Sequence, residues 1–442
     1  MDRSRNGRRG APHGPGALTI VDGFRSAARA RQRALCVAAA PSGNEDLGEL
    51  GELLRTAGVA VVGELVQRRE QPHPNTYVGP GKVAEIKTLA RACDANLVAC
   101  DDELSARQER TLEEALGLPV VDRTTVILDI FASHAGTAEG KLQVELAQLE
   151  YNLARMRGLW SHLERLGGGI GTRGPGETQI ETDRRLARDR IASLRRRLER
   201  VKRTRAVQRS QRERAATPTI ALVGYTNAGK STLLNALTDA EVGVRDRLFH
   251  TLDPTIRMLR LSGRAYLLTD TVGFISKLPH QLIDAFAATL EETRRADLLL
   301  HVLDASAPEA RVEGMERAVE HTLAEIGAGD RPRLLVLNKI DLLDHAAREE
   351  LRLHHPDAVL VSGHTGEGLA ELGARIEAAL LHFLRRVELL VPYAEGGSLA
   401  ELHELAGEVS RQDTPEGVRV RALLPARLAA RFARFGVASR SV

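Results

Sequence analysis

The segment Gly224-Tyr-Thr-Asn-Ala-Gly-Lys-Ser231 has the residue types and spacing of a loop that binds a phosphate. It follows an apolar run, residues 219–223, and leads into a helical pattern at residues 232–237. Glycines let such a loop turn tightly, so that backbone N–H groups and the positive end of the next helix face an anion. The Lys230 ammonium can reach the β- and γ-phosphates, and the Ser231 hydroxyl can bind Mg²⁺. Rather than a chance glycine turn, we predict nucleotide contacts by Gly224, Tyr225, Thr226, Asn227, Ala228, Gly229, Lys230, Ser231 and Thr232.

Two further segments with polar groups at fixed places come next along the chain. Residues 249–253 are a candidate switch I, where Thr251 can offer its hydroxyl to Mg²⁺ and its N–H to the γ-phosphate. Residues 270–273 end an apolar stretch, where Asp270 can hold Mg²⁺ and the Gly273 N–H can sense the γ-phosphate. Loss of that phosphate would free both loops, which makes the pair a switch. We predict nucleotide contacts by Phe249, His250, Thr251, Leu252, Asp253, Asp270, Thr271, Val272 and Gly273.

These segments also supply the candidate catalytic and metal-binding groups. The predicted catalytic residues are Lys230, Thr251 and Gly273, and the predicted Mg²⁺ ligands are Ser231, Thr251 and Asp270. Small GTPases that hydrolyse with their own machinery often place a glutamine directly after the second switch motif, to orient the attacking water. Phe274 holds that position here and cannot do so. We therefore predict slow intrinsic hydrolysis that a partner accelerates by ordering the switches.

The next motif predicts which base is bound. The Asp341 carboxylate of residues 338–341 can accept hydrogen bonds from guanine N1–H and N2–H₂, which adenine does not offer. A buried carboxylate left unpaired is costly, so this residue would reject ATP. Residues 362–364 fit the loop whose backbone N–H contacts guanine O6; alanine is usual at the second position, and Gly363 keeps the N–H but loosens the loop. The predicted guanine contacts are Asn338, Lys339, Ile340, Asp341, Ser362, Gly363 and His364.

Strands that alternate with helices must position these motifs. We expect strands near residues 220–223, 256–261, 265–270, 298–303, 334–337 and 359–361. In open α/β sheets, ligands bind beyond the carboxyl ends of the strands, so the loops should converge. We therefore predict a phosphate-loop GTPase domain over residues 217–384, with a mostly parallel sheet and helices on both faces, that binds GTP or GDP with Mg²⁺.

Upstream of this domain we predict a disordered basic tail over residues 1–30 and a small α/β domain over residues 31–137. Its expected strands lie at residues 34–39, 59–62 and 95–100. Residues 77–82 read as a tight turn into a helix at residues 83–92, the alternative being a second phosphate-binding loop. Asp101, Asp102 and Glu103 read as an acidic cap for a helix at residues 105–116, the alternative being a metal cluster.

For residues 138–216 we predict two long helices that fold back on each other as an antiparallel hairpin, with a glycine-rich tip at residues 167–176. Apolar residues recur at spacings of three and four at Leu142, Leu146, Leu149, Leu153, Met156, Trp160 and Leu163, and again at Ala187, Ile191, Leu194, Leu198 and Val201. Fourteen Lys or Arg side chains lie between Arg184 and Arg214. So one-sided a charge favours structured RNA as the partner, although an acidic protein or the chain's own GTPase domain would also fit.

The rest of the composition bounds the class of protein. The 442 residues are 43% hydrophobic and 27% charged with a net charge of +3, which is typical of globular domains. The three cysteines lack ligand or disulfide spacing, no apolar run is long enough to span a membrane, and no signal peptide is recognisable. We expect a cytoplasmic monomer. Residues 385–442 predict a small α/β appendage, with strands at 387–392 and 418–424, a helix at 398–406 and a short helix at 425–435.

With these segments, the chain resembles the HflX-type GTPases, a ribosome-associated family of translational GTPases. The resemblance is carried by residues 224–231, Thr-Leu-Asp-Pro-Thr at 251–255 and Asp-Thr-Val-Gly-Phe-Ile at 270–275. It also rests on Glu-Gly-Lys-Leu-Gln-Val-Glu-Leu-Ala-Gln-Leu-Glu-Tyr at 139–151 and Gly-Gly-Gly-Ile-Gly-Thr-Arg-Gly-Pro-Gly-Glu-Thr-Gln at 167–179, which ordinary GTPases lack. His250 departs from the small residue that is usual there, which puts the closing of switch I in question.

The resemblance implies binding to the large ribosomal subunit, through its rRNA and ribosomal proteins, and GTP-dependent splitting or rescue of stalled ribosomes under stress. It implies Mg²⁺ held by Ser231 and Thr251. Two other hypotheses remain: a GTPase in rRNA maturation or ribosome assembly, and a nucleotide-gated RNA-binding scaffold in which hydrolysis matters little. Stimulation of turnover by ribosomes separates the last from the others.

Overall fold

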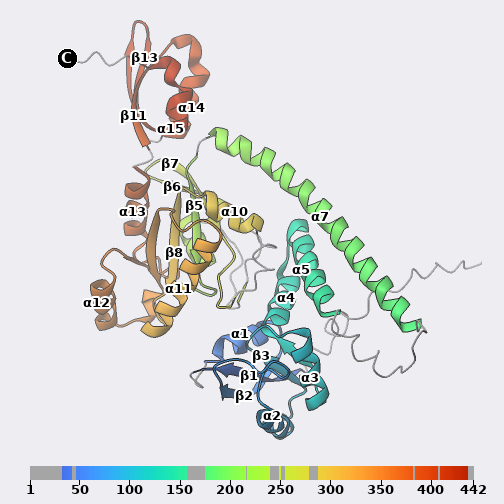
Figure 1. Cartoon of the computed structure of the whole chain (residues 1–442). Coiled ribbons are helices and arrows are strands. Elements are labelled where there is room, and N and C mark those ends of the chain that lie inside the picture. Colours follow the sequence, from blue (N-terminus) through green and yellow to red (C-terminus); the bar gives the residue numbers. More distant parts are fainter. Residues whose placement is uncertain are drawn as a thin grey trace, which may run out of the picture.

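The computed structural model describes residues 32–41, 46–156, 175–215, 217–238, 248–249, 254–277, 287–381, 384–406 and 409–436 (Figure 1). Four sequence predictions lie outside these residues. They are the basic tail at 1–30, the switch I residues His250, Thr251, Leu252 and Asp253, the apolar positions Trp160 and Leu163, and the hairpin tip up to residue 174.

The N-terminal domain is a four-stranded parallel sheet of order β2-β1-β3-β4, with helices on both faces. Its strands are β1 (Arg33–Ala40), β2 (Ala60–Arg68), β3 (Leu97–Cys100) and β4 (Val120–Asp122), and its helices are α1 (Gly48–Thr56), α2 (Pro80–Ala92), α3 (Ala106–Leu116) and α4 (Arg123–His134). Seven of the eight residues of β1 are buried, because apolar clusters cover both faces of the sheet. The predicted strand at 59–62 is the start of the longer β2.

Residues 77–79 lead into α2, which begins at Pro80 with Gly79 as its N-cap, so residues 80–82 of the predicted turn belong to the helix. The prediction that Asp101, Asp102 and Glu103 cap the next helix is wrong. Helix α3 is capped by Ser105, whose hydroxyl accepts a hydrogen bond from the Gln108 N–H, while the Gln108 side chain accepts one from the Ser105 N–H. Among the described residues, no group of three or more His, Cys, Asp or Glu side chains is placed to hold a metal ion.

The arm consists of α5 (Ala138–Met156) and α7 (Pro175–Ala215), which pack against each other (Figure 1). In α7 the predicted apolar positions Ala187, Ile191, Leu194 and Leu198 are buried. In α5 the predicted leucines are only half-buried, and Val144, Ala147 and Tyr151 are the buried apolar residues. These three belong to the core that α4 also lines, so α5 is shared between the arm and the N-terminal domain. No helix within the described ranges is long and apolar enough to cross a membrane.

The GTPase domain has a six-stranded sheet of order β10-β9-β8-β5-β7-β6, in which only the β6–β7 pair is antiparallel. Its strands are β5 (Thr219–Gly224), β6 (Thr255–Leu261), β7 (Arg264–Asp270), β8 (Leu298–Asp304), β9 (Arg333–Asn338) and β10 (Val359–Leu360). Its helices are α8 (Lys230–Thr238), α10 (Ala287–Arg295), α11 (Glu309–Glu325), η3 (Ile340–Leu342), α12 (His345–His354) and α13 (Leu369–Leu381). The predicted fold class, a phosphate-loop GTPase domain after a small α/β domain, is confirmed.

The C-terminal residues form a three-stranded antiparallel sheet of order β11-β13-β12 with its own core. Its elements are β11 (Leu384–Val391), η4 (Tyr393–Glu395), α14 (Gly396–Ala406), β12 (Val409–Thr414), β13 (Gly417–Pro425), α15 (Ala426–Arg431) and η5 (Ala433–Phe435). Strand β12 was not predicted. Its sequence Val-Ser-Arg-Gln-Asp-Thr is polar, and it forms by pairing along one edge of β13.

Candidate nucleotide-binding site

The loop between β5 and α8 has the conformation that its glycines permit. Gly224 has φ +154°, and a Cβ there would lie 2.1 Å from the Val302 carbonyl oxygen. Gly229 has φ +86°, and a Cβ there would lie 2.3 Å from Asn338 Nδ2. Any side chain at either position would collide with a neighbouring strand or with the base-binding loop, so both positions require glycine.

Lys230 begins α8 and is 6% exposed. Its Nζ donates to the carbonyl oxygens of Gly224 (3.0 Å) and Tyr225 (2.8 Å). Burial lowers the pKa of Lys230 to about 8, against an opposing effect of the Asp270 carboxylate. An ammonium that is buried and donates to carbonyl oxygens gains most when an anion approaches, which is the property that a phosphate-binding lysine needs.

Asp270, at the end of β7, is completely buried, and its Oδ2 accepts a hydrogen bond of 2.6 Å from Ser231 Oγ. The next residue, Thr271, donates from Oγ1 to the Leu222 carbonyl (2.6 Å) and so ties β7 to β5. A hydroxyl beside a carboxylate is an all-oxygen donor set, the kind that Mg²⁺ prefers. These residues therefore fit the predicted metal, while the third predicted ligand, Thr251, lies outside the described residues.

Asn338 joins three loops at the base-binding end of the site. Its Nδ2 donates to the Ala228 carbonyl (2.9 Å), and its Oδ1 accepts from the Gly363 N–H (3.0 Å). Ser362 Oγ donates to Asp341 Oδ1 (2.7 Å), which fixes the carboxylate that would receive guanine. The structure thus brings together the two predicted guanine loops. The Gly363 N–H, which was predicted to contact guanine O6, donates to Asn338 Oδ1 in this structure.

Asp304 is a site residue that sequence reasoning missed. It ends β8, and its Oδ2 forms an ion pair with Lys339 Nζ at 2.6 Å. Its Oδ1 accepts hydrogen bonds from the Ser306 hydroxyl (2.6 Å) and the Ser306 N–H (3.0 Å). Lys339 has φ +68°, so this ion pair also secures a backbone conformation that is unfavourable for a lysine. The only signal in the sequence was its position directly after the apolar residues 298–303; the structure adds that Asp304 aligns with Asn338 on β9.

The N-terminal domain contacts the segment after Gly273. Arg123 of α4 is 2% exposed and donates to the Ser276 carbonyl (3.0 Å) and to Asp101 (2.7 Å), and it also pairs with Glu49. Glu49 accepts in turn from the Tyr225 hydroxyl of the phosphate loop, and this hydroxyl accepts from the Ser276 N–H (2.8 Å).

Lys277 continues this contact by pairing with Asp101 and Asp102, both at 2.8 Å. Burial alone would lower the pKa of Lys277, but the two carboxylates outweigh it and the net shift is upward. Beside these ion pairs, the Phe131 ring of α4 meets the Phe249 ring edge-on at 4.6 Å, and His134 Nδ1 lies 2.9 Å from the Phe249 carbonyl oxygen. The N-terminal domain therefore contacts Phe249, the described residue of the candidate switch I, as well as the segment after Gly273.

Phe274 is 2% exposed, and its backbone makes two hydrogen bonds with the phosphate loop. Its N–H donates to the Gly224 carbonyl (3.0 Å), and its carbonyl accepts from the Thr226 N–H (2.8 Å). The side chain lies in the apolar cluster that continues into the N-terminal domain. Phe274 thus has a structural role in place of the water-orienting role that glutamine has elsewhere.

Three family models match the chain in succession. They are a GTP-binding GTPase N-terminal region at residues 44–132, a GTP-binding GTPase middle region at residues 134–212, and a 50S ribosome-binding GTPase at residues 219–339. The GTPase HflX of Lacrimispora saccharolytica is 48% identical over 91% of this chain and 96% of its own length. Those of Caldanaerobacter subterraneus and Escherichia coli are 46% and 47% identical, over 95% and 82% of this chain and 97% and 85% of their own lengths. A solved complex of SsGBP with GDP is 26% identical over 78% of this chain and 98% of its own, with a TM-score of 0.45.

Proposed function

Because the chain belongs to the HflX family of GTPases, we propose that it is a switch that the large ribosomal subunit triggers and that splits or rescues stalled ribosomes under stress. The chain is a GTP-hydrolysing enzyme. The observation that carries the proposal is the set of contacts between the N-terminal domain and the segment 274–277. Through these hydrogen bonds and ion pairs, the N-terminal domain, which lies outside the nucleotide site, is connected to the segment that follows Gly273.

We assign the nucleotide contacts as follows. The backbone N–H groups of residues 227 and 229–231 and the Lys230 ammonium hold the phosphates, and Asp341, fixed by Ser362, selects guanine. Ser231 and Asp270 would hold Mg²⁺, together with Thr251. The metal, when bound, neutralises charge that develops on the transferred phosphoryl group. The Gly273 N–H reports the γ-phosphate.

The slow step follows from Phe274. Its position offers no polar atom to align water, and its side chain is buried in the inter-domain apolar cluster. An external contact must therefore supply or order the missing group. The N-terminal domain can transmit such an external contact to the segment after Gly273, because Arg123 bonds to Ser276 and Lys277 pairs with Asp101.

The arm is the surface that we assign to rRNA. Exposed arginines on α7 include Arg196, Arg197 and Arg200, whereas Arg190 and Arg195 pair with Glu145 and Glu150 of α5. Neutralised phosphates release counterions, so binding through such a surface weakens steeply with salt. We place the protein in the cytoplasm as a monomer that associates with ribosomes.

Steady-state GTP hydrolysis with and without purified 50S subunits or 70S ribosomes tests the proposal. Ribosomes should raise turnover strongly, and Lys230→Ala should abolish it. A variant with Glu in place of Arg196, Arg197 and Arg200 should keep the basal rate of hydrolysis but no longer respond to ribosomes. The dependence of its ribosome affinity on salt should also weaken, by about one unit of logarithmic slope per lost phosphate contact. The same change at Arg385, Arg386 and Arg421 of the C-terminal domain is the matched control.

Absence of stimulation, with RNA binding that ignores the nucleotide, would overturn the switch and favour the RNA-binding scaffold. Stimulation by precursor particles alone would favour ribosome assembly. If ribosomes stimulate the arm variant as strongly as the wild-type protein, the switch stands and the ribosome contact lies on another surface.

A further inference from the structure

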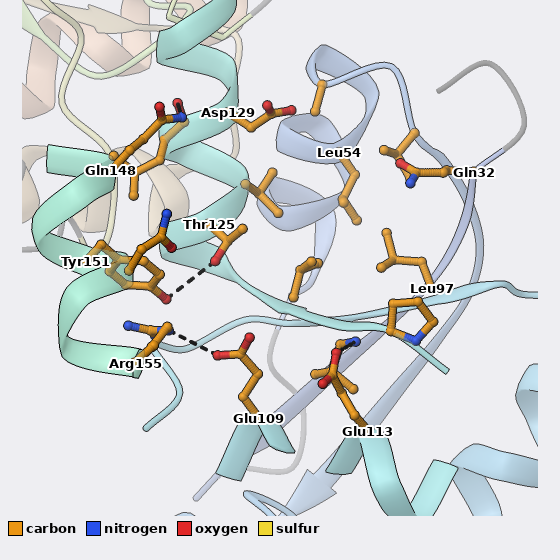
Figure 2. Close-up of a pocket in the computed structure, with 18 residues that line it drawn as sticks. Gln32, Leu54, Leu97, Glu109, Glu113, Thr125, Asp129, Gln148, Tyr151 and Arg155 are labelled. Carbon is orange, nitrogen blue, oxygen red and sulfur yellow. Dashed lines mark hydrogen bonds and ion pairs between the residues drawn. The ribbon is translucent and has the colours of Figure 1, made fainter. Parts of the chain in front are cut away.

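A cavity of about 230 Å³ lies in the N-terminal domain, between the sheet and helices α1, α3, α4 and α5 (Figure 2). None of its lining residues belongs to the nucleotide site. Its apolar wall is formed by Leu54, Val59, Leu97, Val121 and Leu128. Ligand pockets for drug-sized molecules usually measure about 300–1,000 Å³, so this cavity is sized for a ligand of one or two rings.

The charged side chains around the cavity are mostly acidic. Glu109, Glu113 and Asp129 contribute carboxylates, and Arg155 is the single cationic side chain among the described residues that line the cavity. The buried Oε1 of Gln32 has no hydrogen-bond partner among the described residues. The side-chain amides of Gln148 and Asn152 also line the cavity, so donors are present, but three carboxylates against one guanidinium give the lining a net negative charge.

The Arg155 guanidinium is already engaged. It donates to Glu109 Oε2 (3.0 Å; Figure 2). It also donates to Asp122 Oδ2 (2.8 Å) and to the Leu104 carbonyl (2.7 Å), and it lies 3.2 Å above the centroid of the Tyr151 ring. Asp122 also accepts from the Tyr151 hydroxyl, so its charge is satisfied inside the wall. An incoming phosphate or carboxylate would meet three carboxylates and a guanidinium that is already paired.

Glu109 gives the same indication. Burial raises the pKa of its carboxyl, although Arg155 pulls in the opposite direction. One guanidinium shared between two carboxylates leaves the Glu109 charge incompletely compensated in a partly apolar site. A second cation would relieve this, and its N–H groups could donate to Gln32 and Glu113.

From this geometry we infer that the cavity binds a small organic cation, a flat apolar body that carries a protonated amine or amidine. The apolar wall receives the ring, and the carboxylates and the Gln32 oxygen receive the N–H groups. The same reasoning disfavours a second nucleotide in this cavity, because its single guanidinium is already paired and the carboxylates would repel the phosphates. A ligand held here touches α1 and α3 on one side and Gln148 and Asn152 of α5 on the other, so it bridges the domain and the base of the arm.

Calorimetry with three probes of one shape tests this: benzamidine, benzamide and benzoate, which are cationic, neutral and anionic near neutral pH. The full-length protein is first saturated with GDP and Mg²⁺, so that Asp341 is not a competing carboxylate. Benzamidine should bind about tenfold more tightly than benzamide, the usual gain of a charge-assisted hydrogen bond over a neutral one, and benzoate should not bind. Glu113→Gln keeps an acceptor for the Val120 N–H and should remove most of that preference. Glu114→Gln, exposed on the same helix, is the matched control.

Ala57→Leu, which fills the cavity from the end of α1, should abolish benzamidine binding, while an unchanged melting temperature without the probe shows that the domain still folds. Equal binding of the three probes would refute the inference, as would binding that ignores both cavity variants. Displacement of benzamidine by ATP at millimolar concentration would also overturn it, in favour of a second nucleotide site. None of these outcomes depends on whether ribosomes stimulate GTP hydrolysis.

Discussion

The low pKa of Lys230 predicts that nucleotide binding is coupled to proton uptake. In the free site, burial holds this pKa near 8, with Asp270 opposing the shift. A bound diphosphate brings negative charge to the ammonium and raises the pKa. Above pH 8 the free lysine is mostly neutral, so GDP binding must first protonate it. Affinity should therefore fall as the pH rises past 8.

The magnitude follows from the linkage relation. With a pKa of about 8, roughly a tenth of the free Lys230 is neutral at pH 7 and roughly nine-tenths at pH 9, which weakens GDP binding about tenfold over that interval. Proton uptake on binding should rise from about 0.1 at pH 7 to about 0.8 at pH 8.5. Because the folded pKa lies below the ordinary 10.5, the nucleotide-free protein should gain stability as the pH rises from about 8 to about 10.5.

Calorimetry of GDP binding at pH 8.5, in two buffers of different ionisation enthalpy, measures the uptake directly. The Lys230→Arg variant, charged at every accessible pH, should show none in excess of the nucleotide's own titration. Uptake in the wild-type protein that stays near zero up to pH 8.5 would refute the reasoning, because it would mean that Lys230 is fully charged before the nucleotide arrives.

Three further outcomes are expected. Lys277→Ala removes the ion pairs with Asp101 and Asp102, and because the Lys277 side chain is 39% exposed, the free energy lost from the domain contact is about 1 kcal/mol. Amide exchange at residues 274–277 should therefore quicken about fivefold. An unchanged exchange rate would argue against the domain contact. Gly363→Ala places a Cβ 3.2 Å from the Leu233 nitrogen, so scanning calorimetry should show a melting temperature about 2 °C lower, and a higher one would contradict the packing. Asp341→Asn should weaken GDP at least about a hundredfold in competition assays and favour xanthosine diphosphate, and retained guanine preference would remove Asp341 from base selection.

The sequence was most informative where function depends on local geometry. The phosphate loop, the end of β7 and the two guanine loops each combine a strand end with a short polar motif, and strand ends converge by topology. The pairing of Ser362 with Asp341 follows from that convergence. Asp304 lies at an equivalent strand end, but its short run of neighbours matches no recognisable motif, so only the register of β8 with β9 shows its role.

Long-range partners account for the main error. Asp101 and Asp102 look like a helix cap because acidic residues before a helix often are one. Their actual partners, Arg123 and Lys277, lie in another helix and another domain, and Lys277 is 176 residues from Asp101 along the chain. Spacing within a segment holds no information about such a contact.

Helix α5 shows why the arm was only partly predictable. The leucine spacing indicates one apolar seam, yet α5 has two partners: α7 along the arm, and α4 in the domain, which buries Val144, Ala147 and Tyr151. A helix that serves two interfaces has apolar residues around more of its circumference than one seam contains. Periodicity then identifies the helix correctly and misjudges which of its residues are most buried.

This double role of α5 gives the arm two structural connections to the nucleotide site. One is covalent, because α7 ends at Ala215 and β5, which carries the phosphate loop, begins at Thr219. The other passes through packing, from α5 to α4, whose first residue, Arg123, donates to the Ser276 carbonyl beside the loop that we propose as the γ-phosphate sensor. A force on the arm therefore reaches the phosphate loop and the segment 274–277 by separate paths. Relative movement of these two segments is the change that would alter hydrolysis, because Phe274, the first residue of the segment 274–277, is bonded to the phosphate loop through both its N–H and its carbonyl.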